Sequence, residues 1–138
     1  MAENIYLEIV TPEKNVVSEE AQIVVAPGSL GEFGVLSGHT PFMSSLKIGA
    51  VRYDDTSGNQ RIVFVSGGFA EALPDKVTIL AESAERRRDI DLERAKAAKT
   101  RAEERLAREA DDNVNYIRAR AALARAILRI QLAQSKSI

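Results

Sequence analysis

The stretch GSLGEFGVLSGHTP, residues 28–41, carries four of the eight glycines and one of the four prolines of this 138-residue chain. The other glycines end at Gly68 and the other prolines at Pro74, so residues 75–138 contain neither. Glycine and proline occur at turns and bulges but cost about 1 and about 3 kcal/mol inside a helix. The sequence therefore predicts an α+β fold, with a turn-rich β domain over residues 1–85 and a helical domain over residues 86–138.

The two parts also differ in charge. Residues 1–85 hold 5 Lys/Arg and 12 Asp/Glu, a net charge of −7, whereas residues 86–138 hold 14 and 8, a net charge of +6, which sum to −1. An acidic β part with only 5% aromatic residues in the chain argues against nucleic acid as a partner. With no cysteine and one histidine we expect no metal site. No run of about 18 apolar residues occurs, so we expect no direct membrane insertion.

The β part is predicted to consist of short strands joined by turns. Alternating or β-branched runs mark residues 5–10, 22–25, 43–46, 50–53, 61–65, 69–73 and 77–80. The sequence Asp-Thr-Ser-Gly-Asn at 55–59 is typical of a hairpin loop. Because no helical segment separates the strands, a sandwich or flattened barrel is favoured over a sheet of βαβ units.

The second part is predicted to be an antiparallel hairpin of helices over residues 90–109 and 114–134, with the turn at 111–113. Asp89 is the expected N-cap of the first helix. The expected contact lines are Leu92, Ala95, Ala98 or Lys99, Ala102 and Leu106 on the first helix and Ile117, Ala121, Ala124 and Leu128 on the second. Alanine buries little area, so the hairpin should be held weakly and be able to detach.

Arginines recur with the same spacing on both predicted helices. Steps of seven and then four residues separate Arg94, Arg101 and Arg105, and the same steps separate Arg118, Arg125 and Arg129. Residues 113–138 contain five Lys/Arg and no acid, so these cations need a partner on the first helix, on another protein or on an anionic ligand. Guanidinium groups suit a polyphosphate because each can bond two oxygens. The alternative is a solvated basic face.

Three motifs occur in the same order as in one protein family. They are residues 28–41, Val65-Ser66-Gly67-Gly68 and Ile90-Asp91-Leu92-Glu93-Arg94-Ala95. Together they resemble the epsilon subunit of bacterial F-type ATP synthase, and the resemblance spans the chain. It implies an N-terminal ten-stranded β-sandwich followed by a C-terminal antiparallel two-helix hairpin.

The resemblance also implies a function. It implies a non-catalytic rotor subunit of the central stalk, which couples ion flow through the membrane c-ring to ATP synthesis and inhibits ATP hydrolysis through its C-terminal helices. The implied partners are the gamma subunit, the c-ring and the alpha/beta catalytic head. The implied location is the cytoplasmic face of the bacterial cell membrane, as a peripheral part of the complex. In the family the extended hairpin lies against an acidic loop of the beta subunit, and the matching cations here are Arg118, Arg120, Arg125 and Arg129.

A regulatory ATP site is a further implication of the resemblance, with no cofactor required. The family pattern is Ile or Leu, Asp, two variable residues, Arg and Ala. The matching positions are Glu85, Ile90, Asp91, Arg94, Ala95, Arg101, Arg125 and Arg129, in which the acids would address adenine and the arginines the phosphates. Asp91 has a structural alternative as an acid in the first helical turn. The chain contains no GxxxxGK sequence, so binding without hydrolysis is expected.

Two loop residues are assigned to partners by the resemblance. Glu32 is the expected c-ring contact, and its alternative is a solvated acid. His39 is the expected contact to the rotor stalk, and its alternative is a loop residue that makes a local hydrogen bond. The alternative function for the whole chain is a free-standing nucleotide-sensing module without a rotary complex.

Overall fold

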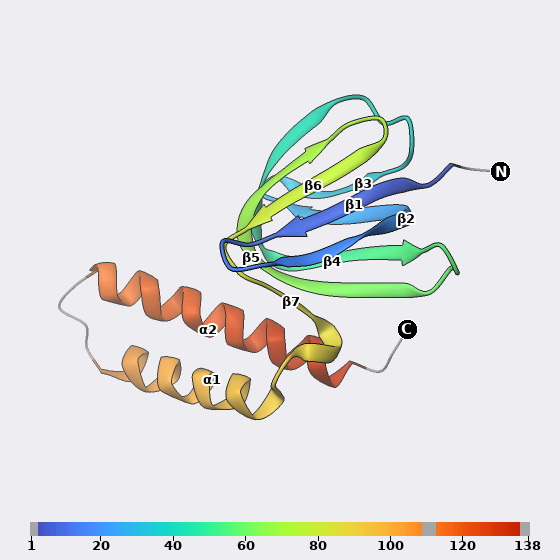
Figure 1. Cartoon of the computed structure of the whole chain (residues 1–138). Coiled ribbons are helices and arrows are strands. Elements are labelled where there is room, and N and C mark those ends of the chain that lie inside the picture. The colour runs from blue at the N-terminus through green and yellow to red at the C-terminus, as the bar shows by residue number, and fades with distance from the viewer. Residues whose placement is uncertain (1–2, 109–112, 136–138) are drawn as a thin grey trace. The chain divides into compact units, whose positions relative to one another are not determined.

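A computed structural model describes residues 3–108 and 113–135. The chain divides into two units, and the division falls between Arg87 and Arg88. The first unit contains all the strands of the described residues, and the second contains both α-helices (Figure 1).

Five strands of the first unit close into a barrel. The pairing runs β1-β6-β5-β4-β2, and β2 pairs in turn with β1, while β3 extends the sheet beside β2 and β7 pairs with β5. All pairs are antiparallel except β1 with β6. The prediction of a sandwich or barrel is therefore confirmed. The strands are β1 (Ile5–Val10), β2 (Asn15–Gly28), β3 (Gly31–Val35), β4 (Phe42–Asp55), β5 (Gln60–Ala72), β6 (Lys76–Ala81) and β7 (Ala84–Arg86).

The ten separate strands implied by the family resemblance are not found, because the described residues form seven. Predicted strands are joined into longer ones: 43–46 and 50–53 both lie in β4, and 61–65 and all but the last residue of 69–73 lie in β5. A straight strand of 14 residues would span roughly 46 Å, so such strands must bend to follow the barrel. Gly67 and Gly68, between the two predicted strands that β5 joins, have φ of 75° and 126°, a backbone conformation that glycine adopts readily and that fits a bend.

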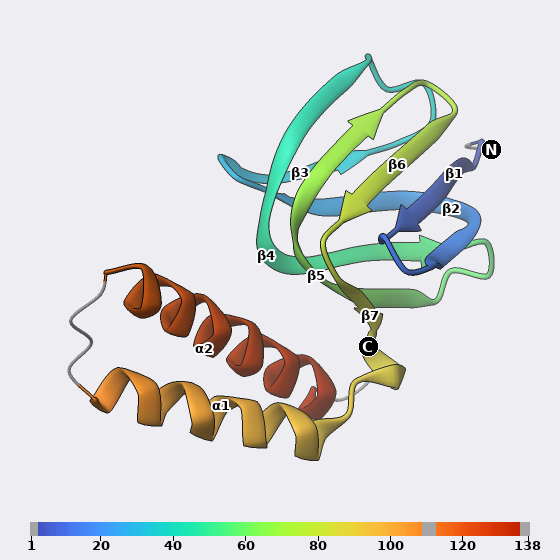
Figure 2. The ribbon, with the colours of Figure 1, turned by 60° about the vertical axis from the view of Figure 1, so that its left-hand side comes forward.

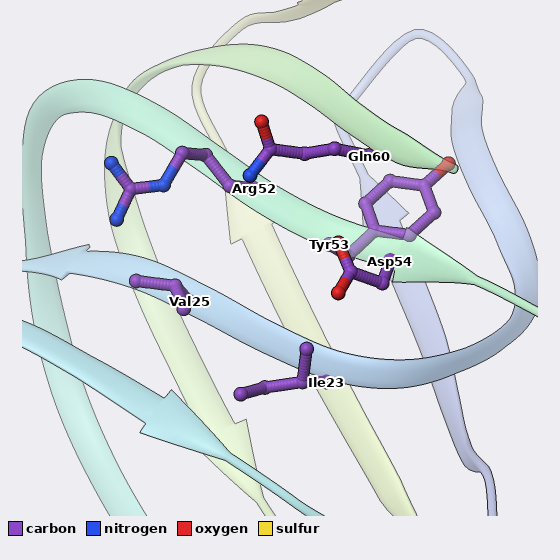
Figure 3. Close-up of a pocket in the computed structure, with 6 residues that line it drawn as sticks. All are labelled: Ile23, Val25, Arg52, Tyr53, Asp54 and Gln60. Atoms are coloured by element: carbon purple, nitrogen blue, oxygen red, sulfur yellow. The ribbon is translucent and has the colours of Figure 1, made fainter. Parts of the chain in front are cut away.

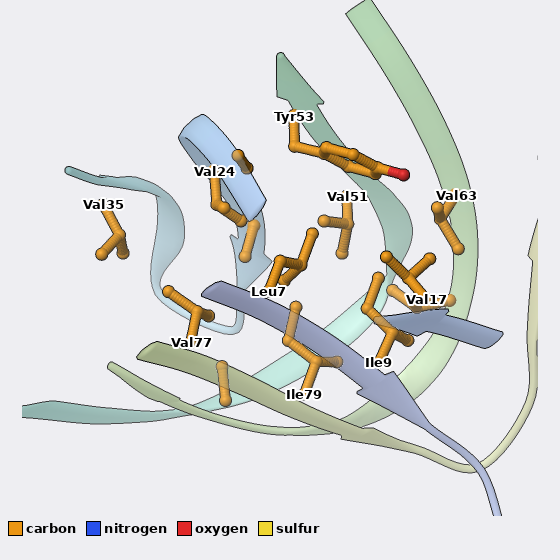
Figure 4. Packing of buried hydrophobic residues seen from close by; sticks show 14 of the residues in the cluster. Leu7, Ile9, Val17, Val24, Val35, Val51, Tyr53, Val63, Val77 and Ile79 are labelled. Atoms are coloured by element: carbon orange, nitrogen blue, oxygen red, sulfur yellow. The ribbon is translucent and has the colours of Figure 1, made fainter. Parts of the chain in front are cut away.

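Aliphatic side chains and one tyrosine fill the barrel (Figure 4). In β1 alternate residues point inward, and Ile5, Leu7 and Ile9 are fully buried. Tyr53 of β4 joins them with 1% of its surface exposed. This core lies wholly within the first unit.

The predicted hairpin loop at residues 55–59 is confirmed, because β4 ends at Asp55 and β5 begins at Gln60. One carboxylate oxygen of Asp55, Oδ1, accepts hydrogen bonds from the backbone N–H groups of Ser57 and Asn59, both at 2.9 Å. The other, Oδ2, accepts from Arg61 Nε at 3.0 Å. The hydrogen bond from Asn59 is the largest cause that lowers the pKa of the Asp55 carboxyl.

The second unit is a pair of antiparallel helices, α1 (Leu92–Ala107) and α2 (Asn113–Gln134) (Figure 2). The expected N-cap was wrong: Asp89 ends a short 3₁₀ turn that begins at Arg87, and Asp91 caps α1. Asp91 Oδ1 accepts a hydrogen bond from the backbone N–H of Arg94 at 3.0 Å, as an N-cap does. Residues 111 and 112 of the expected turn lie outside the described residues.

The expected contact line of α2 was also wrong. Ile117 is 65% exposed and Ala124 is exposed, whereas Ala119 and Ala126 are buried. On α1 the buried residues are Ala95 and Ala102. Because both buried pairs are seven residues apart, Ala95 can lie opposite Ala126 and Ala102 opposite Ala119 in an antiparallel pair.

Candidate functional site

Four arginines of the hairpin each stand directly before one of its buried alanines. The dipeptides are Arg94-Ala95, Arg101-Ala102, Arg118-Ala119 and Arg125-Ala126. One residue corresponds to about 100° around a helix, so each arginine lies beside the line of buried alanines. In two antiparallel helices that face each other, residues just before the contact line fall on the same side of the pair. We call this set of four arginines the basic flank.

The basic flank has the dimensions of an extended anion site. Arg94 and Arg101 are separated by seven residues, about 10 Å along the helix axis, and so are Arg118 and Arg125. Arg125 is half-buried and the other three are exposed. Arg129, one turn beyond Arg125, is half-buried and makes an interaction within the chain. Arginines from two helices can bond several oxygens of one polyphosphate.

The predicted ATP motif at residues 90–95 forms the start of α1. Ile90 is 9% exposed, Asp91 is the N-cap, Arg94 belongs to the basic flank and Ala95 is buried between the helices. Asp91 Oδ1 accepts a hydrogen bond from the Arg94 backbone, whereas the Arg94 side chain makes no hydrogen bond within residues 3–108 and 113–135. Ile90, Asp91 and Ala95 therefore have roles in packing or helix initiation, and the ATP-binding role of the motif stays a prediction.

Glu85 lies in a different unit from the rest of the predicted ATP site. It is the middle residue of β7 and stands opposite Phe64 of β5 in the strand register. Ile90, Asp91, Arg94, Ala95, Arg101, Arg125 and Arg129 all belong to the second unit. The structure thus groups these residues on the hairpin, and the part of Glu85 stays a prediction.

The cations predicted to face the beta subunit are not equivalent. Arg118 and Arg120 are exposed. Arg120 Nη1 lies 3.4 Å from Tyr116 Oη, to which it donates, and the guanidinium lies 5.9 Å from the centre of the Tyr116 ring. Sequence reasoning missed this contact, although the i,i+4 spacing of an aromatic residue and an arginine was a usable signal.

Glu32, the predicted c-ring contact, has a partner within the barrel. Arg52 Nη2 lies 3.1 Å from Glu32 Oε1, and both side chains remain about half exposed. The two residues lie on β3 and β4, which flank β2, where Pro27 is opposite Glu32 and Val25 is opposite Arg52. Residues so far apart in sequence are brought together only by the register, which the sequence alone did not predict.

His39, the predicted contact to the rotor stalk, makes a local hydrogen bond. Its Nδ1 lies 2.6 Å from the Thr40 carbonyl oxygen, and its ring meets Phe42 edge-on at a centroid distance of 6.3 Å. Phe42 also contacts Phe33 at 5.1 Å. The rings of Phe33 and Phe42, but not that of His39, border a shallow groove of about 360 Å³, lined by Leu30, Gly31, Glu32, Phe33, Phe42, Met43, Ser44 and Ser45.

A second groove, of about 390 Å³, lies on the barrel where β2, β4 and the start of β5 meet (Figure 3). Strand β2 supplies Ile23 and Val25, and the polar groups come from β4 and β5. Gln60 Oε1 is buried there and has no hydrogen-bond partner among the described residues. The groove depends on the β2–β4 register, so the sequence did not predict it. Its other lining residues are Arg52, Tyr53 and Asp54.

A β-barrel followed by a two-helix hairpin is the two-part fold of the delta/epsilon chains of ATP synthase. The family model of the beta-sandwich domain of these chains matches residues 4–87, and that of their long alpha-helix domain matches residues 88–134. An ATP synthase epsilon chain of Desulforapulum autotrophicum is 61% identical over 99% of this chain and 100% of its own length. One of Syntrophobacter fumaroxidans is 57% identical over 97% of this chain and 98% of its own.

Two solved structures have the same fold. A chain of the Euglena gracilis mitochondrial ATP synthase (OSCP/F1/c-ring) matches with a TM-score of 0.76 at 24% identity, over 90% of this chain and 78% of its own. A chain of the Tetrahymena thermophila mitochondrial ATP synthase (central stalk/c-ring) matches with a TM-score of 0.65 at 10% identity, over 96% and 98%.

The chain belongs to the delta/epsilon family, and within it to the epsilon chains of bacterial F-type ATP synthase. It is a non-catalytic subunit of that enzyme, as the resemblance implied. Within residues 3–108 and 113–135, neither helix is long and apolar enough to cross a membrane.

Proposed function

We propose that the chain is the rotor subunit that joins the gamma subunit to the membrane c-ring, and that its hairpin restrains ATP hydrolysis. The barrel serves as the rigid coupling block, and the hairpin is the regulatory element. The family assignment supports the coupling role, and so do the two solved structures of the same fold, which are from a synthase assembly with a c-ring and, for Tetrahymena thermophila, from a central stalk with its c-ring. As part of this complex the chain would lie at the cytoplasmic face of the bacterial cell membrane.

The observation that carries the regulatory proposal is the basic flank. It presents arginines of both helices on one side of the hairpin, beside a contact line of small residues. We propose two uses for the cations of the hairpin. When the helices are paired, Arg94, Arg101, Arg125 and Arg129 bind the phosphates of ATP, with Asp91 and Glu85 near the base. When the hairpin is extended, Arg118, Arg120, Arg125 and Arg129 contact an acidic surface of the beta subunit in the alpha/beta catalytic head.

These two uses exclude each other, because Arg125 and Arg129 cannot serve both partners at once. Bound ATP would favour the paired state by its difference in affinity for the two states. Only a few kcal/mol of such difference is needed to change which state dominates. A line of alanines gives weak pairing because each buries little apolar area, which suits an element that changes state.

Nucleotide binding is tested by calorimetry on the purified chain. We expect Arg94→Ala and Arg125→Ala to weaken ATP binding roughly ten-fold or more, because a charge-assisted hydrogen bond contributes about 1.5–3 kcal/mol. Arg108→Ala is the matched control, since Arg108 is an exposed C-cap residue of α1 outside the proposed site. Equal affinities in all variants, or no heat of binding for the parent at millimolar ATP, would mean that the basic flank is a solvated face and not an ATP site.

Inhibition is tested separately with residues outside the proposed ATP site. In the assembled catalytic head, the double charge reversal Arg118→Glu/Arg120→Glu should raise the half-inhibitory concentration of the subunit roughly five-fold, a change of about 1 kcal/mol. Raising the salt concentration should act in the same direction. The control reverses Arg105 and Arg108 of α1. If the Arg118/Arg120 variant inhibits as the parent does, the proposed electrostatic contact is wrong, and steric blocking by the hairpin is the remaining explanation of inhibition.

The alternative function, a free-standing nucleotide sensor, makes the opposite prediction about partners. Expressed with the other synthase subunits, the chain should co-purify with the gamma subunit if it belongs to the rotor. A chain that binds ATP but recovers no gamma subunit would favour the sensor.

A further inference from the structure

Strand β7 is short for an element that joins the two units. It has three residues and pairs with β5 alone, with Ala84, Glu85 and Arg86 opposite Val65, Phe64 and Val63. So few ladder hydrogen bonds give little stability by themselves. The chain then enters a 3₁₀ turn at Arg87, and the boundary between the units follows at once.

The side chain of Arg86 supplies the contacts that β7 lacks. Its Nη1 donates a hydrogen bond to Tyr53 Oη at 3.2 Å, and its Nε donates to the Val16 carbonyl oxygen at 3.3 Å. Tyr53 Oη in turn donates to Glu19 Oε1 at 3.0 Å. We call Arg86, Tyr53 and Glu19 the Arg86 cluster. It links β7 to β2 and β4, from which it is 70 and 33 residues away in sequence.

The Tyr53 hydroxyl lies at the centre of the cluster, between Arg86 and Glu19. The Tyr53 hydroxyl donates a hydrogen bond to Glu19 and accepts one from Arg86, so both its donor and an acceptor position are used. Burial raises the pKa of the Tyr53 hydroxyl, which therefore keeps its proton through the physiological range. A neutral hydroxyl thus lies between a cation and an anion, and removing it leaves two charged groups without their shared partner.

We propose that the Arg86 cluster is a positioning device that fixes the point from which the hairpin leaves the barrel. Any change in hairpin position then pivots within residues 87–90, while β7 stays in its sheet. Loss of the cluster would release the three residues of β7 from the sheet. The connection between the barrel and the hairpin would then be longer by about 10 Å, at about 3.3 Å per residue. The anchor itself does not depend on nucleotide binding, whereas an effect of this added length on the inhibition of ATP hydrolysis rests on the proposed function.

Hydrogen exchange on the full chain tests the anchor. Tyr53→Phe removes the hydroxyl and keeps the ring and the net charge, and Arg86→Gln removes the guanidinium. Both should speed exchange of the amides at residues 84–86 roughly ten-fold or more, because a hydrogen bond to a charged group contributes about 1.5–3 kcal/mol. Exchange in β1 and β6 should stay as in the parent. Arg88→Gln is the control, since it removes the same charge two residues later at an exposed position.

A second measurement separates positioning from loss of stability. The chain has no cysteine, so spin labels can be attached at Ser57→Cys on the barrel and Ala97→Cys on the hairpin. Arg86→Gln should broaden the distance distribution between the labels, and Arg88→Gln should not. Glu19→Gln keeps an acceptor for the Tyr53 hydroxyl. Its distance distribution should therefore broaden less, relative to the parent, than that of Glu19→Ala. Unchanged exchange at 84–86 in both cluster variants, or an equal rise in every strand, would overturn the proposal.

Discussion

At the scale of single residues, Asp55 shows how one carboxylate organises a loop. Its oxygens hold the backbone of the 55–59 turn and the Arg61 side chain, which lowers its pKa below the ordinary 3.8. A lowered pKa in the folded state favours the ionised form. The stabilisation is therefore present above the pKa of the unfolded chain and is lost as the pH falls through the folded-state value.

Asp55→Asn should accordingly lower the midpoint of thermal unfolding at pH 7, because the amide keeps the shape of the side chain but loses its charge. The difference between parent and variant should shrink as the pH falls below about 4. Asp54→Asn, which removes the same charge one residue earlier, is the control, and the midpoints are followed by circular dichroism. A difference that stays constant down to pH 2 would mean that the charge of Asp55 is not what stabilises the loop.

Sequence reasoning reached some residues and not others for physical reasons. The 55–59 loop was predictable because its stabilising contacts are local, all within six residues of Asp55. The contacts of Glu32 with Arg52 and of Arg86 with Tyr53 span 20 and 33 residues. They depend on strand register and closure of the barrel, which hydrophobic alternation does not specify.

At the scale of elements, the helices were predictable and their contact line was not. The absence of glycine and proline after Pro74 predicted a helical part, and the turn signal at 111–113 divided it into two helices. Apolar residues on α2, however, occur on every side between Ala119 and Ala133, so a line through Ile117 and Ala124 fitted the helical period as well as the true one. Only the partner helix decides which side is buried.

The observed contact line predicts that the hairpin is sensitive to bulk at Ala126. Ala126→Leu adds three carbons at a position that is 1% exposed, which should cost about 1–3 kcal/mol through overpacking. Hydrogen exchange should quicken in α1 and α2 while the barrel strands stay protected. Ala124→Leu is the control on the exposed side of the same helix. If both leucine variants behave alike, the line through Ala119 and Ala126 is not the contact.

At the scale of the whole molecule, the two units are expected to differ in independence. The barrel closes and buries its core with residues up to Arg86. A fragment ending at Arg87 should therefore be soluble and unfold in one cooperative transition in calorimetry. It should still support coupling in the assembled synthase while inhibition is lost. A fragment that binds a hydrophobic dye and lacks a cooperative transition would show that the barrel requires the hairpin.

In the four Arg-Ala dipeptides of the hairpin, the alanine packs against the partner helix and the arginine forms the cationic side. Both properties therefore depend on the same spacing along the helix. Inserting a single residue between Ala119 and Arg125 would rotate everything after it by about 100°, which would place Arg125 where Ala126 now faces the partner helix. The helices would lose their close contact, and the cations after the change would leave the basic flank. The hairpin can thus accept many substitutions at its exposed positions, while a change of length inside either helix would abolish its pairing and its cationic side in one step.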